Sequence, residues 1–80
     1  MANRDNPQVQ FQWLLEELCI AYGFCLPSSE EPRLRALLAL DPEGFTDAVF
    51  EVEGMDPRLY KQLRRVVRDT VDKHLRRWAD

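Results

Sequence analysis

The segment PRLYKQLRRVVRDTVDKHLRRW, residues 57–78, carries the clearest structural signal in the chain. Its apolar residues recur every three or four positions, as in a helix that buries one face. Basic and acidic side chains occupy the opposite side. The pattern therefore predicts a long amphipathic C-terminal helix over residues 57–78, with an apolar side formed by Leu59, Leu63, Val66, Val67, Thr70, Val71, His74, Leu75 and Trp78.

Three further helices are expected upstream, over residues 7–22, 30–40 and 42–53. Asn or Asp followed by Pro is typical of a helix start, because the polar side chain can cap free N–H groups and Pro fits the first turn. Such pairs occur at Asn6-Pro7, Asp41-Pro42 and Asp56-Pro57, and glycines that favour helix ends follow at Gly23 and Gly54.

Two local features concern the start of the second helix and the type of element formed by residues 46–52. Ser28 and Glu31 have the spacing of a reciprocal capping box, which predicts the start of the second helix. Residues 46–52 contain β-formers and allow a strand. Their inward set fits the helical period better than alternation, so a helix is expected there.

Size and composition indicate one small helical domain. The chain has 80 residues, of which 45% are hydrophobic and 31% charged, and this length predicts a single domain over residues 1–80. Residues 1–6 are expected to form a flexible arm and show no secretory signal. No apolar run is long enough to span a membrane. We expect an all-α bundle of about four helices.

The two cysteines, Cys19 and Cys25, are interpreted as reduced thiols in a cytoplasmic protein. A disulfide between them remains the alternative. With His74 they make three Cys/His residues, too few for a structural zinc site, so no metal is expected. The loop between them is unusually apolar, and Phe24 and Leu26 are expected to tuck under the bundle rather than lie exposed.

The first helix carries a second apolar stripe, formed by Val9, Trp13 and Ile20, on the side opposite its main apolar face. A small protein has difficulty burying both sides of one helix. We interpret the stripe as a protein interface with Trp13 as its anchor, because aromatic residues dominate interface cores. The alternative is that the N-terminal arm or a neighbouring helix covers the stripe.

Charge is divided unevenly along the chain. Residues 1–56 carry 3 basic and 11 acidic side chains, and residues 57–80 carry 8 basic and 3 acidic ones. The C-terminal helix thus has a basic face that suits an anionic partner such as nucleic acid. The favoured alternative is intramolecular pairing with the acidic residues of 43–53. Residues proposed for the anionic partner are Arg58, Lys61, Arg65, Arg68 and Arg76.

No catalytic constellation or cofactor motif is recognisable. His74 lies on an apolar face, and the three glycines form no phosphate-binding pattern. We therefore expect no enzyme, no cofactor and no membrane partner. The leading hypothesis is a small, non-enzymatic helical module that binds another protein or a second copy of itself as a homodimer. The alternative hypothesis is a binder of nucleic acid or another anionic partner.

Overall fold

The computed structural model describes residues 7–79, and every regular element in that range is a helix. The fold class expected from the sequence is therefore confirmed, including the helix rather than strand over residues 46–52. The flexible arm expected at residues 1–6 lies outside the described residues. The elements are α1 at Pro7–Tyr22, the 3-10 turn η2 at Ser28–Glu30, α2 at Glu31–Leu40, α3 at Pro42–Val52 and α4 at Lys61–Ala79.

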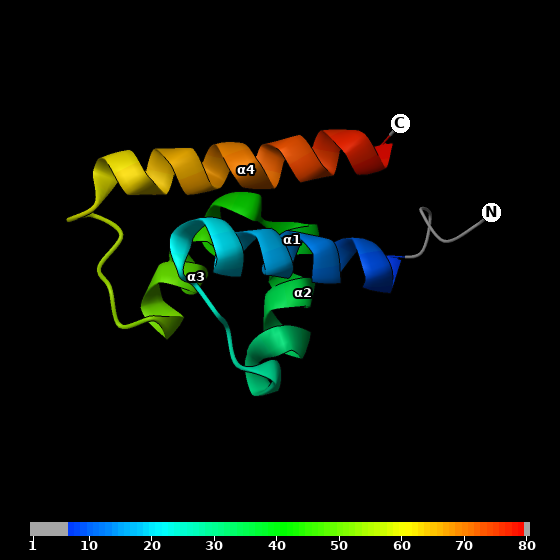
Figure 1. The fold of residues 1–80 in the computed structure, drawn as a ribbon, viewed down its shortest axis with the longest axis horizontal. Coiled ribbons are helices and arrows are strands. Elements are labelled where there is room, and N and C mark those ends of the chain that lie inside the picture. The colour runs from blue at the N-terminus through cyan, green and yellow to red at the C-terminus, as the bar shows by residue number, and fades with distance from the viewer. Residues whose placement is uncertain (1–6, 80) are drawn as a thin grey trace.

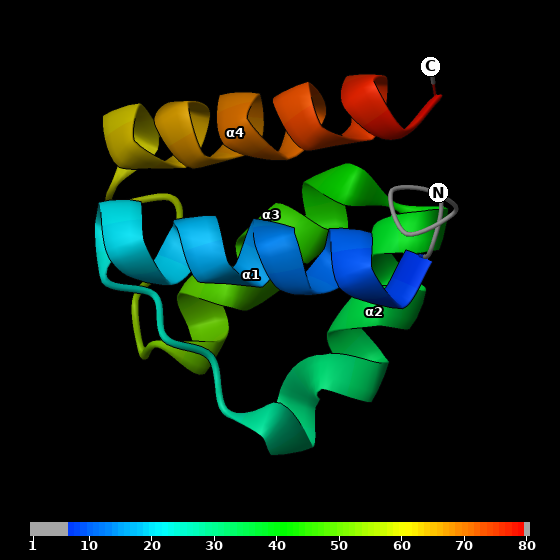
Figure 2. The ribbon, with the colours of Figure 1, turned by 45° about the vertical axis from the view of Figure 1, so that its right-hand side comes forward.

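The helices α1 and α4 lie side by side and run in opposite directions (Figures 1 and 2). The start of α1 and the end of α4 therefore lie at the same end of the molecule. Figure 1 shows α2 on the side of α1 that faces away from α4, and α3 passing behind α1. Direct contacts join α1 to α4, α2 to α3 and α3 to α4.

The core is centred on α3, which presents buried side chains on most of its circumference. Aromatic contacts connect α3 to the start of α1 and to the loop that follows α1. Phe45 meets Phe11 edge to face with ring centroids 6.4 Å apart, and Phe50 meets Phe24 in the same way at 5.0 Å. The remaining core side chains are Leu14, Leu15, Leu18, Leu34, Leu38, Ala48, Val49, Val67 and Val71.

Two glycines end helices as expected, since Gly23 and Gly54 have φ of 79° and 77°. After α1, the Phe24 N–H donates to the Leu18 carbonyl at 3.1 Å and the Gly23 N–H to the Cys19 carbonyl at 2.9 Å. The Gly23 bond is that of an αL motif, and both bonds satisfy carbonyls that are left free at the end of the helix. The turn sends Phe24 into the core, so the expectation that this loop is tucked in is confirmed for Phe24.

The C-terminal helix begins four residues later than expected. The Asp56 carboxylate accepts a hydrogen bond from the Arg58 N–H at 2.9 Å, and the Leu59 N–H donates to the Asp56 carbonyl at 3.0 Å. Residues 57–60 thus form a separate turn, and α4 starts at Lys61. Leu59 is 77% exposed rather than part of the apolar side, and Val66 is also exposed. The prediction for these two residues is wrong.

The side-chain caps expected for α2 and α3 do not form. The 3-10 turn η2 precedes α2 at the place where the capping box was expected. No side chain caps the first turn of α2. The Glu31 carboxylate instead accepts a hydrogen bond from Gln12 Nε2 in α1 at 2.8 Å. Asp41 likewise makes no side-chain cap to α3. The starts of α2 and α3 were predicted within one residue, although their capping bonds were predicted wrongly.

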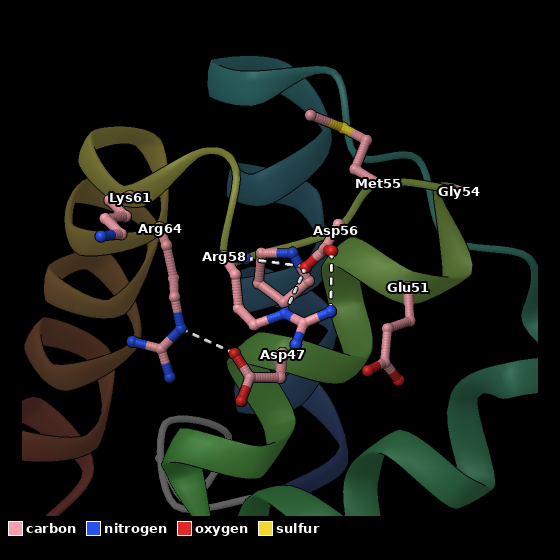
Figure 3. A pocket seen from close by; sticks show the side chains of 9 residues that line it. Asp47, Glu51, Gly54, Met55, Asp56, Arg58, Lys61 and Arg64 are labelled. Atoms are coloured by element: carbon pink, nitrogen blue, oxygen red, sulfur yellow. Dashed lines mark hydrogen bonds and ion pairs between the residues drawn. The ribbon is translucent and has the colours of Figure 1, made fainter.

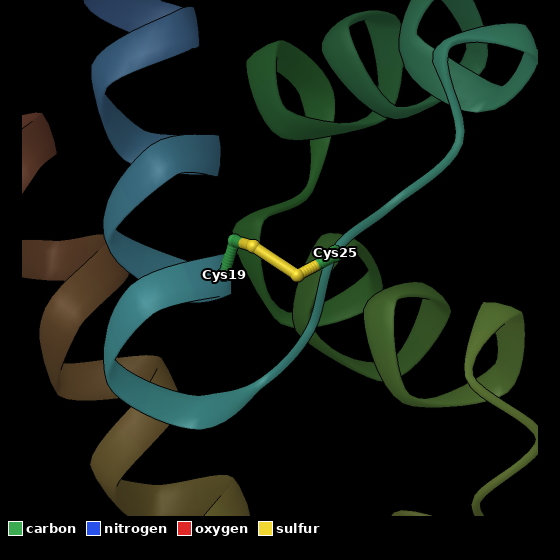
Figure 4. Close-up of a disulfide and its surroundings, with 2 residues drawn as sticks. All are labelled: Cys19 and Cys25. Carbon is green, nitrogen blue, oxygen red and sulfur yellow. A yellow bond between two sulfur atoms is a disulfide. The ribbon is translucent and has the colours of Figure 1, made fainter.

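Cys19 and Cys25 form a disulfide, so the prediction of two reduced thiols is wrong (Figure 4). The cause is the turn at Gly23, which reverses the chain and brings the loop back against the last turn of α1. The Cα atoms of the two cysteines are consequently 4.4 Å apart, a separation that a disulfide can bridge. The bond fastens residues 23–27 to α1. A cytoplasmic location, which the reduced thiols had supported, loses that support.

Reduction of the disulfide is expected to destabilise the fold without unfolding it. The bond closes a loop with a sequence separation of 6, and loop-closure entropy for so short a loop contributes about 2 kcal/mol. The double variant Cys19→Ser, Cys25→Ser should lose about that much free energy of unfolding and keep its helical circular dichroism. Denaturant titration with and without reductant measures it. Two free thiols in the oxidised native protein would contradict the bond.

Candidate functional site

A network of ion pairs joins α3 to α4. The Arg64 guanidinium contacts Asp47 at 2.6 Å and Glu43 at 2.8 Å. Arg68 contacts Glu43 at 2.7 Å and also pairs with Asp72 one turn along α4. The intramolecular pairing that the sequence favoured is therefore present for Glu43 and Asp47. Arg68, which was assigned to an anionic partner, is engaged inside the molecule.

Arg58 is also engaged, because it folds back onto Asp56. Its Nε and Nη2 donate to the two carboxylate oxygens at 3.2 and 3.1 Å. Of the residues predicted for an anionic partner, Lys61, Arg65 and Arg76 are exposed and form no ion pair within residues 7–79. The structure therefore does not bring the five predicted cations together as one free basic face.

An open hollow of about 780 Å³ lies where α3, the turn at residues 54–58 and the start of α4 meet. Figure 3 shows Arg64 directed to Asp47 and Arg58 folded over Asp56, with Lys61 and Glu51 at the margins. Cations and carboxylates alternate around it and largely neutralise one another. The hollow is therefore a poor site for an anion despite its three basic side chains.

The pairing in this network changes the acidity of Glu43. Hydrogen bonds from Arg64 and then Arg68 hold the pKa of the Glu43 carboxyl below its ordinary value of 4.5. Both guanidinium groups favour the ionised carboxylate, since a cationic donor binds a charged acceptor more strongly than a neutral one. The ion pairs thus link α3 to α4 most strongly when Glu43 is ionised.

A second group of charges joins α1 to α4. The Glu17 carboxylate contacts His74 Nε2 at 2.7 Å and Lys73 Nζ at 3.0 Å. These hydrogen bonds, first from His74 and then from Lys73, hold the pKa of Glu17 below its ordinary value. His74 is buried and packs edge to face against Trp78 at 5.9 Å between ring centroids. Its position is that of a core histidine with one partner.

The predicted interface stripe on α1 is exposed at two of its three positions. Trp13 is 46% exposed and Ile20 is 80% exposed, whereas Val9 is partly buried. Leu40, Leu59, Tyr60 and Val66 are exposed as well, and single apolar side chains on a protein surface are common. Trp13 and Ile20 thus lie on the outside of α1, and the interface stays a prediction.

Sequence reasoning missed an apolar groove formed by α1, α2 and the end of α4. Its volume is about 510 Å³, within the range of about 300–1,000 Å³ that is usual for ligand pockets. Small residues of α2 keep it open, and a pair of alanines three residues apart beside a leucine stripe was the only signal in the sequence. The groove is lined by Gln10, Phe11, Pro32, Arg35, Ala36, Leu38, Ala39, Leu75 and Trp78.

A third hollow, of about 470 Å³, lies beside the disulfide. We call it the Trp13 hollow. Sequence reasoning found its aromatic residue but not its concave shape, because the shape depends on the disulfide and on the approach of α2. It is lined by Gln12, Trp13, Leu15, Glu16, Cys19, Cys25, Leu26 and Glu31.

Other kinds of site find no support in the described part of the chain. No group of three or more His, Cys, Asp or Glu side chains within residues 7–79 is arranged to hold a metal ion. None of the helices in that range combines the length and apolar character needed to cross a membrane. The groove and the Trp13 hollow are thus the concave surfaces from which a function is inferred.

Comparison of the chain with protein-family models, curated proteins and solved structures gives no match. No residue therefore receives a role from a relative. The candidate roles rest on the geometry of the groove, the Trp13 hollow and the exposed side chains around them.

The Glu43 ion pairs predict a loss of stability in acid. Because the pKa of Glu43 is lowered by folding, its contribution is present above pH 4.5 and is lost as the pH falls through the folded-state pKa. Glu43→Gln should cost at most about 1 kcal/mol near neutral pH, because the pairs are largely exposed. It should also flatten the fall in stability below the ordinary pKa. Denaturant titrations across that pH range measure both effects.

Glu51→Gln is the matched control, since Glu51 is exposed in the same helix and forms no ion pair within residues 7–79. Its free energy of unfolding should follow the wild-type pH profile. Equal pH profiles for the two variants would contradict a specific role for the Glu43 network.

Proposed function

We propose that this chain is a small, non-enzymatic protein-interaction module that binds an amphipathic helix of a partner protein in the groove between α1, α2 and α4. The observation that carries the proposal is the groove itself, a concave and mainly apolar surface on a very small protein. Apolar grooves between helices are a recurring way to bind the apolar face of a helical segment.

The lining explains why an apolar segment suits the groove. Phe11 and Leu38 form buried surface, while Leu75 and Trp78 are only partly covered by the rest of the fold. A partner that covers this surface removes apolar area from water, at a gain of roughly 25 cal/mol per Å². Aromatic residues such as Trp78 are also frequent anchors in interfaces.

Charge narrows the choice of partner. Arg35 is the one charged residue among those that line the groove. Its guanidinium lies over the Phe11 ring, 5.6 Å from the ring centroid, and forms no ion pair within residues 7–79. A carboxylate on the partner, placed beside the apolar side chains, would complement it. The proposed partner segment is thus apolar on one face, with an acidic residue at the edge.

Self-association stays part of the proposal, because Trp13 and Ile20 offer a second exposed apolar surface. Of the residues predicted for the alternative function, binding of nucleic acid or another anionic partner, only Lys61, Arg65 and Arg76 have no ion pair within residues 7–79. Arg77 is a further exposed cation of α4. Asp69 lies on the same exposed side of α4 and reduces its attraction for phosphates. No observation therefore favours this alternative over the groove.

A test of the groove uses the apolar anion 8-anilinonaphthalene-1-sulfonate as the probe. In the background Trp13→Phe, Trp78 is the single tryptophan and reports binding nearby. The probe should quench Trp78 emission, and Ala39→Glu should weaken its binding about tenfold, because the new carboxylate repels the sulfonate and blocks the apolar surface. Fluorescence titration measures the dissociation constant.

Ala21→Glu provides the same substitution at an exposed alanine of α1 outside the groove. It should leave the titration unchanged, and circular dichroism should show native helix in both variants. Equal affinities in Ala39→Glu and Ala21→Glu would reject the groove as a binding site. Light scattering of the same proteins behind a sizing column then identifies a second copy as partner, if a dimer is lost only in Ala39→Glu.

A further inference from the structure

The Trp13 hollow is lined by both apolar and polar side chains. Leu15, Leu26 and the disulfide supply the apolar part, and Trp13 has nearly half of its surface exposed. The disulfide and the hydrogen bond from Gln12 to Glu31 hold the two walls of the hollow together. The shape is therefore fixed by bonds between α1 and the segment that leads into α2.

Two carboxylates of this hollow lack a cation. Neither Glu16 nor Glu31 forms an ion pair with any residue in the range 7–79, and Glu31 is held only by the neutral amide of Gln12. Their sequence neighbours differ, since Glu17 pairs with Lys73 and Glu30 with Arg33. Negative charge is thus left uncompensated at the hollow, although adjacent glutamates are compensated.

The aromatic ring has no cation over it either. The cation–π contact found within residues 7–79 joins Arg35 to Phe11, not to Trp13. The indole of tryptophan is the side chain that attracts cations most strongly through its face. An exposed indole beside two unpaired carboxylates in a concave surface therefore matches the chemistry of a bound organic cation.

We propose that the Trp13 hollow binds an arginine side chain of a partner protein. The guanidinium is planar, so it can stack on the indole of Trp13 while its edge donates two hydrogen bonds to a carboxylate. Glu16 and Glu31 supply the charge that complements it. A metal ion fits less well, because no third metal-binding side chain joins the two carboxylates within residues 7–79. The site is distinct from the groove and does not depend on it.

The probe is the capped tripeptide acetyl-Ala-Arg-Ala-amide, and the variant Trp78→Phe makes Trp13 the single tryptophan. Binding is expected in the millimolar range, about 1–10 mM, because one side chain makes the contacts. The indole N–H resonance of Trp13 should shift during the titration. The citrulline peptide, which has the same shape without charge, should bind at least about fivefold more weakly. The lysine peptide should lie between them.

Matched variants distinguish binding at the Trp13 hollow from nonspecific attraction of a cationic peptide to an acidic protein. Glu16→Gln with Glu31→Gln should remove the preference for arginine over citrulline. Glu51→Gln with Glu53→Gln removes the same charge from the end of α3 and should leave the preference intact. Ala39→Glu should also leave it intact, so failure of the groove proposal and failure of this one are distinguishable.

Three outcomes would overturn the proposal. Arginine and citrulline peptides could bind equally, both pairs of glutamine variants could weaken binding to the same extent, or the Trp13 resonance could fail to move at about 50 mM peptide, well above the expected dissociation constant. The first would exclude a charge-specific site, the second would reduce the effect to net charge, and the third would exclude the hollow itself.

Discussion

Burial of α3 is the constraint on which the rest of the structure depends. Phe45, Val49 and Phe50 are completely inaccessible to solvent. Phe45 and Val49 share one face of the helix and Phe50 lies on another, so α3 needs apolar neighbours on more than one side. Rings from the start of α1 and from the loop after it meet Phe45 and Phe50, while α2 and α4 contact α3 directly. The sheltered position of α3 therefore fixes the places of the other three helices.

The exposed surfaces follow from this arrangement. The helix α1 uses one face for the core, which leaves Trp13 and Ile20 outside. The helix α2 directs Leu34 and Leu38 inward and leaves the small side chains Ala36 and Ala39 beside the end of α4, where they cannot fill the space next to Trp78. The groove is thus the space that three helices leave open when their larger side chains serve α3.

The features that depend on local sequence patterns, such as helix bounds and glycine turns, were largely predicted from the sequence. The bounds of α1 were correct at both ends, and the glycine turns were placed correctly because few other residues adopt positive φ. The start of α4 was predicted wrongly, since Asp56 holds Arg58 in a separate turn rather than capping a helix. The disulfide and the Trp13 hollow were missed because both depend on how the loop after Gly23 returns to α1. Only the tertiary path of the chain determines that approach.

The distribution of charge shows why sequence position alone is a poor guide to a binding surface. The surplus of cations after residue 57 suggested an anion site, yet Arg64 and Arg68 serve the contact between α3 and α4, and Arg58 serves a turn. Pairs of this kind stabilise a fold weakly, but they remove charge from the surface offered to partners. The charged side chains that remain without an ion pair are a better guide to a binding surface than the net charge of a segment. Beside the groove and the Trp13 hollow, the charged side chains without an ion pair within residues 7–79 are one arginine and two glutamates. The partners that we propose for these two surfaces carry the opposite charge.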